Sequence, residues 1–89
     1  MRRIAIRVSG KVQGVFFRAS AKAKADQLGI NGFVRNEIDG DVYLEAEGND
    51  QPLIEFEAWC KKGPSQARIL TCDVKETDAN GAAGFLIIR

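Results

Sequence analysis

Apolar and polar residues alternate at the start of the chain, and the spacing then changes. Ile4, Ile6 and Val8 are each separated by one polar or small residue, and this period of two is typical of a strand with one buried face. From Phe17 onward the apolar or small positions recur every three or four residues, which predicts a helix. Gly29 is then placed to end that helix. A strand followed by a helix is therefore predicted for the first third of the chain.

Two further strands joined by a tight turn are predicted in the middle of the chain. Residues 33–37 and 42–47 flank the segment Ile38-Asp39-Gly40-Asp41. Asp-Gly is a favoured pair in the turns of β-hairpins, so the two segments are expected to pair antiparallel. Arg35 and Glu37 would then point away from the buried face, and we interpret them as exposed, solvated charges.

A second helix and two more strands complete the pattern. Asn49 and Pro52 supply a polar cap and an early proline, which are both favoured where a helix begins. An apolar stripe at helical spacing follows, and Lys61-Lys62-Gly63-Pro64 ends the helix. Residues 70–75 alternate again as a fourth strand, and residues 85–89 form a short final strand after a glycine-containing loop.

The order of these elements predicts an α+β fold. A β-α-β-β-α-β chain with a short terminal strand is expected to fold as a ferredoxin-like sandwich, with an antiparallel sheet and two helices on one of its faces. The 89 residues suit one compact domain, so residues 1–89 are predicted to form a single domain. This fold hosts many functions and does not decide among them.

The charge and hydropathy of the chain exclude several kinds of partner. Lys and Arg total 13 and Asp and Glu total 12, and the net charge of +1 provides no broad field for nucleic acid or an anionic membrane. No run of residues is long enough to span a bilayer, and the N-terminus lacks the apolar core of a signal peptide. We expect a cytoplasmic monomer without nucleic-acid or membrane partners, in which any anion site is local.

Two residue types that often carry catalysis, histidine and cysteine, give no signal for it here. The chain contains no histidine, which is the commonest general base and metal ligand. Cys60 and Cys72 match neither a Cys-x-x-Cys motif nor a zinc pattern, and reduced thiols are the more common outcome, although a disulfide stays open. A metal-dependent phosphatase would need Glu37, Asp39 and Asp41 as ligands, but such a hairpin is more often a solvated turn. We expect neither a metal nor a cofactor.

The loop between the first strand and the first helix suits an anion. Its sequence is Gly10-Lys11-Val12-Gln13-Gly14-Val15-Phe16-Phe17-Arg18. Gly10 and Gly14 allow successive N–H groups to turn inward as a nest, next to the positive end of the helix dipole. Arg18, in the first helical turn, can then bind two phosphoryl oxygens at once. A plain turn followed by a surface arginine explains the same spacing and stays an alternative.

Asn36 is an unusual residue for the end of a strand. Asparagine is poor strand material, and its side chain can both accept a hydrogen bond from a water and donate one to it. Asn36 can equally begin the turn that follows, which propensity alone favours. Both roles stay open on these grounds.

Two ordered motifs resemble the acylphosphatase family. The first is the loop from Gly10 to Arg18, and the second is Gly32-Phe33-Val34-Arg35-Asn36 followed by Asp39-Gly40. The similarity continues through Gly63-Pro64 and Ala67-Arg68 to Phe85 and Ile87, and so covers nearly the whole chain. Members of that family adopt the ferredoxin-like sandwich, so the resemblance implies the same fold as the periodicity.

The resemblance implies hydrolysis of the carboxyl-phosphate bond of small acyl phosphates, without a metal, a cofactor or a covalent enzyme intermediate. By position, Arg18 matches the family's phosphate-binding arginine, and Asn36 matches its water-orienting asparagine. The family's phosphate cradle matches the backbone amides of Gln13, Gly14, Val15, Phe16, Phe17 and Arg18. Phe33 stands where many members have tryptophan.

The strongest rival from another class is an RNA-binding module, because ferredoxin-like sandwiches also serve that purpose. Such modules need aromatic residues on adjacent strands of the open sheet face, with basic residues around them. The strand aromatics Phe33, Tyr43 and Phe85 match no such motif, and the charge is nearly balanced. The sequence therefore favours the hydrolase.

Overall fold

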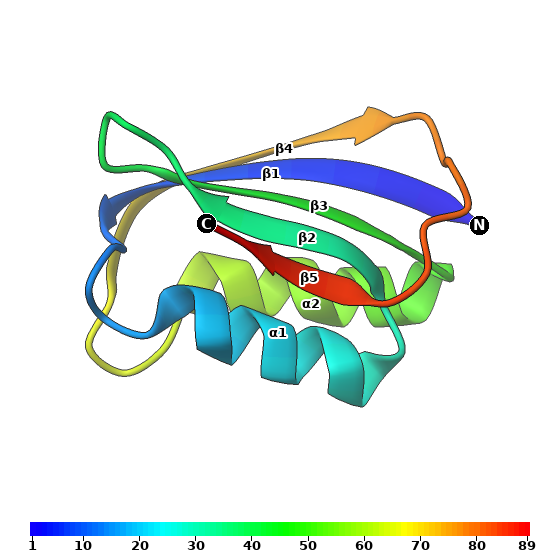
Figure 1. Cartoon of the computed structure of the whole chain (residues 1–89), viewed down its shortest axis with the longest axis horizontal. Helices are drawn as coiled ribbons and strands as arrows, with labels where there is room; N and C mark the ends of the chain where they lie inside the picture. The colour runs from blue at the N-terminus through cyan, green and yellow to red at the C-terminus, as the bar shows by residue number, and fades with distance from the viewer.

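The computed structural model describes residues 1–89 and contains two helices and five strands (Figure 1). In chain order the elements are β1 (Arg2–Lys11), α1 (Phe17–Leu28), β2 (Asn31–Asn36), β3 (Val42–Gly48), α2 (Asp50–Lys62), β4 (Arg68–Thr77) and β5 (Phe85–Ile88). This is the predicted order, and the strands differ from the predicted ranges only at their ends. The ferredoxin-like fold is therefore confirmed.

The five strands form one sheet in the order β4-β1-β3-β2-β5. The first four strands of the chain pair antiparallel as predicted, whereas β5 runs parallel to β2, so the sheet is mixed. The topology explains this difference. After β4 the chain crosses one end of the sheet through residues 78–84 and returns in the direction of β2 (Figure 1). The alternation of residues 85–89 indicates a strand but not its partner.

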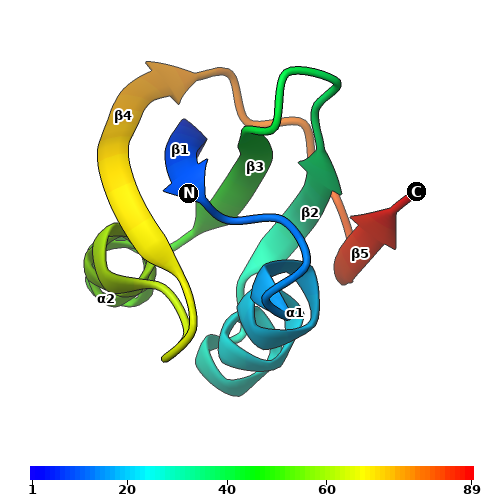
Figure 2. The ribbon, with the colours of Figure 1, turned by 90° about the vertical axis from the view of Figure 1, so that its left-hand side faces the viewer.

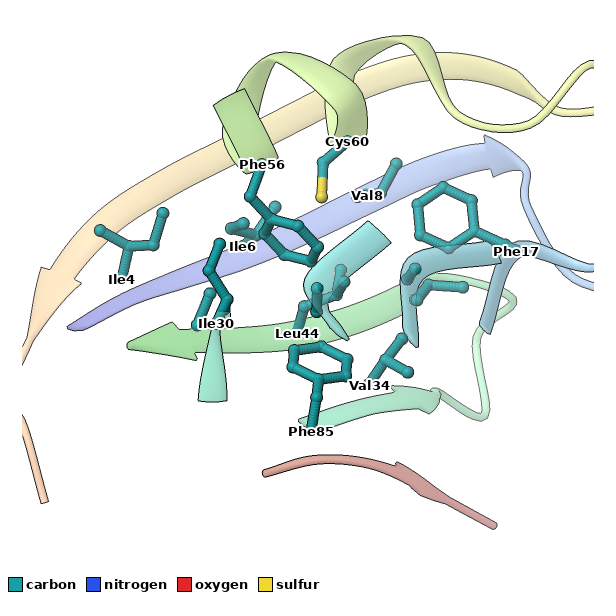
Figure 3. Packing of buried hydrophobic residues seen from close by; sticks show 14 of the residues in the cluster. Ile4, Ile6, Val8, Phe17, Ile30, Val34, Leu44, Phe56, Cys60 and Phe85 are labelled. Carbon is teal, nitrogen blue, oxygen red and sulfur yellow. The ribbon is translucent and has the colours of Figure 1, made fainter. Parts of the chain in front are cut away.

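Both helices cover one face of the sheet (Figure 2). Their buried positions recur at helical spacing and are Phe17, Ala21 and Ala25 on α1, and Leu53, Phe56 and Cys60 on α2. These side chains meet the inward positions of the strands, among them Ile6, Val34 and Leu44 (Figure 3). Full burial of a Val, Leu, Ile or Phe side chain contributes roughly 1.5–3 kcal/mol of transfer free energy, so this cluster is the main source of stability.

Local signals set the ends of the helices, as the sequence predicts. Gly29 follows α1 with φ +70°, a left-handed conformation that glycine adopts without steric cost. Gly63 follows α2 with φ +70° and ψ −178°, a different conformation that is also essentially restricted to glycine. Asn49 precedes α2, where its carbonyl oxygen accepts the N–H of Leu53 at 3.1 Å while its side chain makes no capping hydrogen bond. Neither helix is long and apolar enough to cross a membrane.

A buried ion pair on the other face of the sheet holds the loop of residues 78–84 between β4 and β5, called the crossing below. Arg3 is buried and pairs with Glu45 at 2.7 Å and with Glu47 at 3.1 Å. Glu47 also accepts the backbone N–H groups of Asn80 and Gly81 at 2.9 and 3.0 Å. One carboxylate thereby joins two strands to the loop that leads to β5.

Arg35 and Glu37 are not the free, solvated charges that the sequence predicts. Both are only partly exposed. Glu37 pairs with Arg35 at 3.5 Å and with Arg7 of β1 at 3.4 Å. The contact with Arg7 joins residues that are distant in the sequence, so the alternation within one strand could not reveal it.

Candidate active site

A cavity of about 270 Å³ lies where three segments meet: the β1–α1 loop with the first turn of α1, the end of β2, and the end of β5 with the residue after it. Its wall includes Gly14, Phe16 and Arg18 from the first segment, Asn36 from the second, and Ile87 and Arg89 from the third. Figure 1 shows the start of α1, the end of β2 and the C-terminus at the same end of the molecule. Segments that are distant in the sequence therefore build one site.

The β1–α1 loop contains two residues with positive φ, which is a feature of anion-binding nests. Gly14 has φ +74° and Phe16 has φ +63°, whereas Val15 between them does not have a positive φ. Such an alternation turns successive N–H groups toward one concave side. Phe16 is the only residue other than glycine with a positive φ, and strain of this kind costs about 1–3 kcal/mol. It occupies the N-cap of α1, at the positive end of the helix dipole.

Side chains next to the nest hold it in place. Val15 is buried in the core. Nε2 of Gln13 donates hydrogen bonds to the carbonyl oxygens of Glu37 and Asp41, at 2.8 and 3.0 Å. These bonds fasten the loop to the hairpin that begins directly after Asn36. The nest and the end of β2 are therefore held in a fixed relation.

The six residues predicted for the phosphate cradle divide into two groups. Four of them line the cavity, namely Gly14, Phe16, Phe17 and Arg18. Gln13 and Val15 do not line it, because their side chains contact the hairpin and the core. Their predicted role concerns the backbone amides, and it stays a prediction.

Asn36 has an unused hydrogen-bond acceptor at the cavity. Its Oδ1 is buried and has no partner, although buried polar atoms are nearly always paired. The alternative role, the start of the turn, is not supported by the hydrogen bonds of the hairpin. There Asp39 accepts the N–H of Asp41 at 3.0 Å, and the N–H of Glu37 donates to the carbonyl oxygen of Asp41 at 2.8 Å. Asn36 thus lines the cavity and keeps an unpaired acceptor, and its water-positioning role stays a prediction.

Arg18 brings a positive charge to the same wall. Four other arginines, Arg2, Arg3, Arg7 and Arg35, form ion pairs with carboxylates, whereas Arg18 forms none. No acidic side chain lines the cavity. The wall therefore presents a guanidinium group, a helix N-terminus and an amide side chain, a combination that suits a phosphoryl group.

The carboxylates that a metal-dependent phosphatase would need surround Arg7 instead. Arg7 pairs with Glu37 at 3.4 Å, with Asp39 at 2.8 Å and with Asp41 at 2.8 Å. The backbone N–H of Asp41 and the guanidinium group of Arg7 lower the pKa of Asp39. No group of three His, Cys, Asp or Glu side chains is arranged to hold a metal ion. These carboxylates stabilise the hairpin and lie outside the cavity wall.

The two cysteines are free thiols rather than a disulfide. Burial raises the pKa of both groups, and it raises that of Cys60 well above its ordinary value. The thiolate is the reactive form of cysteine, and neither residue lines the cavity. Neither is therefore placed to act as a nucleophile there.

The open face of the sheet carries one feature that the sequence did not indicate. Phe33 and Tyr43 lie on adjacent strands, with ring centroids 6.0 Å apart, which is an arrangement that RNA-binding modules use. The guanidinium carbon of Arg35 lies 5.5 Å from the centroid of Phe33 and 4.9 Å from that of Tyr43. Tyr43 also donates a hydrogen bond to the carboxylate of Glu45. Because Arg35 covers the rings and acidic groups adjoin them, the RNA-binding alternative gains no support.

The fold and the cavity define the class: a small α+β protein with a ferredoxin-like sandwich and a cavity at a strand-to-helix loop, lined by two arginines. Comparison with known proteins then gives the family. The model of the acylphosphatase family matches residues 4–87, so the chain belongs to the acylphosphatase family. As a member of that family, it is an enzyme.

Individual relatives agree with this assignment over almost their whole length. The acylphosphatase of Methylococcus capsulatus is 47% identical over 100% of this chain and 98% of its own. Among solved structures, the acylphosphatase from Bacillus subtilis matches with a TM-score of 0.97 and 33% identity, and the match covers 100% of both chains. The acylphosphatase from Coxiella burnetii matches with a TM-score of 0.94 and 37% identity, over 98% of this chain and 92% of its own.

Proposed function

We propose that the chain hydrolyses the carboxyl-phosphate bond of acyl phosphates, giving a carboxylate and inorganic phosphate. The observation that carries this proposal is the meeting of Arg18 and Asn36 at one cavity, where Arg18 has no carboxylate partner and Asn36 has an unpaired acceptor. The family and the fold support the same reaction. Water attacks the phosphoryl group directly, and no covalent enzyme intermediate forms.

The phosphoryl group lies at the floor of the cavity, where Arg18 and the backbone amides of residues 13–18 hold it. The planar guanidinium group matches two phosphoryl oxygens. The amides at the start of α1 donate to the remaining oxygens, and the helix dipole favours their negative charge. Because Val15 and the side chain of Gln13 fasten the loop, these donors need little reorganisation in the transition state.

Asn36 positions the attacking water. Its Oδ1 accepts a hydrogen bond from the water and holds it in line with the departing carboxylate. The cavity wall contains no histidine, lysine or carboxylate side chain that could act as a general base. The phosphoryl group itself therefore accepts the proton of the water in this proposal. A pH–rate profile that required an essential base on the enzyme would contradict this step.

The leaving group explains why the site needs no general acid. Carboxylic acids have a pKa of about 4, so a carboxylate departs at neutral pH without being protonated. What remains is to hold the phosphoryl group, stabilise its charge and align the water, which is positioning and electrostatics. In this proposal the residues of the cavity do all three without a metal or a cofactor.

The first test measures the release of phosphate and benzoate from benzoyl phosphate in the presence of a chelator. The parent is compared with Asn36→Ala and with Asn49→Ala, which removes an exposed asparagine whose side chain makes no capping hydrogen bond. By analogy with the loss of one oxyanion-hole donor, Asn36→Ala should lower kcat by about 10²–10³-fold. Asn49→Ala should keep the activity of the parent.

The possible outcomes separate the reaction from the role of the residue. If the parent and Asn49→Ala turn over benzoyl phosphate in the presence of chelator and a folded Asn36→Ala variant does not, both the reaction and the role of Asn36 are supported. If the folded parent shows no turnover above background, the proposed activity is wrong. Full activity in Asn36→Ala would be consistent with the proposed reaction but would refute the water-positioning role of Asn36. Arg18→Gln should in addition weaken competitive inhibition by inorganic phosphate, because Arg18 holds the phosphoryl group.

A further inference from the structure

Arg89 lines the same cavity, and the reaction proposed above does not use it. The side chains of β5 alternate between two faces. Phe85 is buried and Ile87 packs against the core, whereas Leu86 and Ile88 are exposed. If this alternation continues for one more residue, Arg89 lies on the same face as Phe85 and Ile87. That is the face of the sheet that carries the helices and the cavity.

The pairing of β5 with β2 brings Arg89 to Asn36. The two strands are parallel, and Arg35 is partnered with Ile88. The next position in this register places Arg89 beside Asn36, and neighbouring strands lie about 4.8 Å apart. Figure 1 shows the C-terminus close to the end of β2. A second guanidinium group therefore stands next to the residue that positions the water.

The positive charge of Arg89 is not used elsewhere in the fold. The chain has seven arginines. Those that form ion pairs with carboxylates are Arg2, Arg3, Arg7 and Arg35. Those that form none are Arg18, Arg68 and Arg89, and two of these three line the cavity. No acidic side chain lines the cavity, so the negative charge of the chain nearest to Arg89 there is its own α-carboxylate, since Arg89 is the last residue of the sequence.

Arg18 and Arg89 lie at different depths. Arg18 is half-buried beside the nest, and the acceptor of Asn36 is fully buried, so the phosphoryl group occupies the floor. Arg89 and Phe16 are exposed, and Phe16 has a relative exposure of 75%, so these two form the rim. An acyl chain attached to a phosphoryl group at the floor would extend toward this rim. There Phe16 supplies an aromatic ring and Arg89 a guanidinium group.

We propose that Arg89 is a specificity-determining residue, which binds an anionic group at the far end of the acyl chain. The preferred substrates are then monophosphates of dicarboxylic acids, rather than acyl phosphates of the same length with an uncharged end. Phe16 contacts the carbon chain between the two anionic ends. This inference rests on the proposed hydrolysis of acyl phosphates.

The test compares kcat/KM for succinyl phosphate and for butyryl phosphate, which have the same chain length but differ in charge at the far end. The variants are Arg89→Gln and Arg68→Gln, since Arg68 is an exposed, unpaired arginine that does not line the cavity. The parent should prefer succinyl phosphate by about tenfold, a typical effect of one hydrogen bond to a charged group. In Arg89→Gln, the ratio of kcat/KM for succinyl phosphate to kcat/KM for butyryl phosphate should approach one, mainly because KM for succinyl phosphate rises. Arg68→Gln should keep the ratio of the parent.

Either of two results would overturn the proposal: no preference in the parent, or a preference that survives in Arg89→Gln. Binding of stable phosphonates keeps the test separate from turnover. The parent should bind 4-phosphonobutyrate more tightly than butylphosphonate, and Arg89→Gln should remove the difference.

The binding measurement also separates the possible contacts of Arg89. If Arg89→Gln weakens the binding of inorganic phosphate as much as the binding of 4-phosphonobutyrate, then Arg89 binds the phosphoryl group and the proposal is wrong. If the binding preference is present while the parent hydrolyses no acyl phosphate, the proposed function fails and the assignment of Arg89 stands.

Discussion

Phe16 has a backbone conformation that few phenylalanine residues adopt. Its φ of +63° is left-handed, and its side chain is mostly exposed, so little apolar burial offsets the strain. Such strain persists where the surrounding structure over-determines the backbone, and it is common at functional sites. Here the buried neighbours Val15 and Phe17 fix the chain on both sides. The alternation of φ that forms the nest therefore has an energetic cost at Phe16.

Two substitutions separate this strain from the contribution of the side chain. Phe16→Gly and Phe16→Ala both remove the exposed ring, but only glycine adopts the left-handed conformation without a steric penalty. Phe16→Gly should therefore be more stable than Phe16→Ala by about 0.5–1 kcal/mol. Urea unfolding of the two variants measures the difference. Equal or reversed stability would show that the backbone at this position is not strained.

At the level of elements, the site depends on the contact between the β1–α1 loop and the β2–β3 hairpin. Gln13 makes this contact by donating to two main-chain carbonyl oxygens of the hairpin. The loop leads to Arg18 in the first turn of α1, and the hairpin turn follows Asn36, so we expect the contact to set the distance between the phosphoryl cradle and the water site. A misplacement of about 1 Å can lower a rate about 10²-fold. The side chain of Gln13 is therefore expected to matter although it does not line the cavity.

Gln13→Glu should be more harmful than Gln13→Ala. Alanine removes two hydrogen bonds, each worth about 0.5–1.5 kcal/mol net, whereas an ionised glutamate places negative charge against two carbonyl oxygens and donates nothing. Both variants should lose stability and kcat/KM, and part of the excess loss in Gln13→Glu should recover at acidic pH, where the carboxyl group regains a donor.

Urea unfolding and initial rates over a pH series test this expectation for Gln13. Gln51→Glu is the control, because Gln51 is exposed on α2. A Gln13→Glu variant as stable and active as the parent would show that the contact does not position the site.

At the level of the whole molecule, Glu47 helps to close one end of the sheet. Its side chain is 3% exposed, pairs with Arg3 and accepts the backbone N–H groups of Asn80 and Gly81 in the loop between β4 and β5. The N–H of Asn80, together with Arg3 and the N–H of Gly81, lowers the pKa of Glu47, although burial acts in the opposite direction.

The lowered pKa of Glu47 predicts a specific acid sensitivity. Its contribution to stability is fully present above the ordinary pKa of 4.5 and is lost as the pH falls through the lower pKa of the folded state. Glu47→Gln should therefore be less stable than the parent at neutral pH. The difference between their free energies of unfolding, called the gap here, should become smaller as the pH falls. Urea unfolding over a pH series measures the gap, with the exposed Glu55→Gln as control. A gap that does not change with pH would contradict the prediction.

The local patterns of the chain were sufficient for the order of the elements, and they made Arg18 and Asn36 candidates for a site without deciding their roles. Strand alternation, helical spacing and the ends of the helices at Gly29 and Gly63 depend on neighbours within a few positions, so they could be predicted directly. Arg18 and Asn36 lie in short motifs next to a glycine-containing loop and a tight turn. Their candidacy could therefore be stated before it was known that they share a cavity.

Only the tertiary structure decided which distant segments lie side by side. The alternation of a strand shows which residues share a face, but it does not identify the neighbouring strand or its direction. The parallel pairing of β5 with β2 follows from the path of the chain across the end of the sheet, and it places Arg89 beside Asn36. The contacts of Gln13 with the hairpin and of Glu47 with the crossing likewise join residues that meet only after the sheet has formed. The sequence by itself thus determined the elements and the chemistry available at the site, whereas long-range strand pairing determined how the residues of the site are arranged.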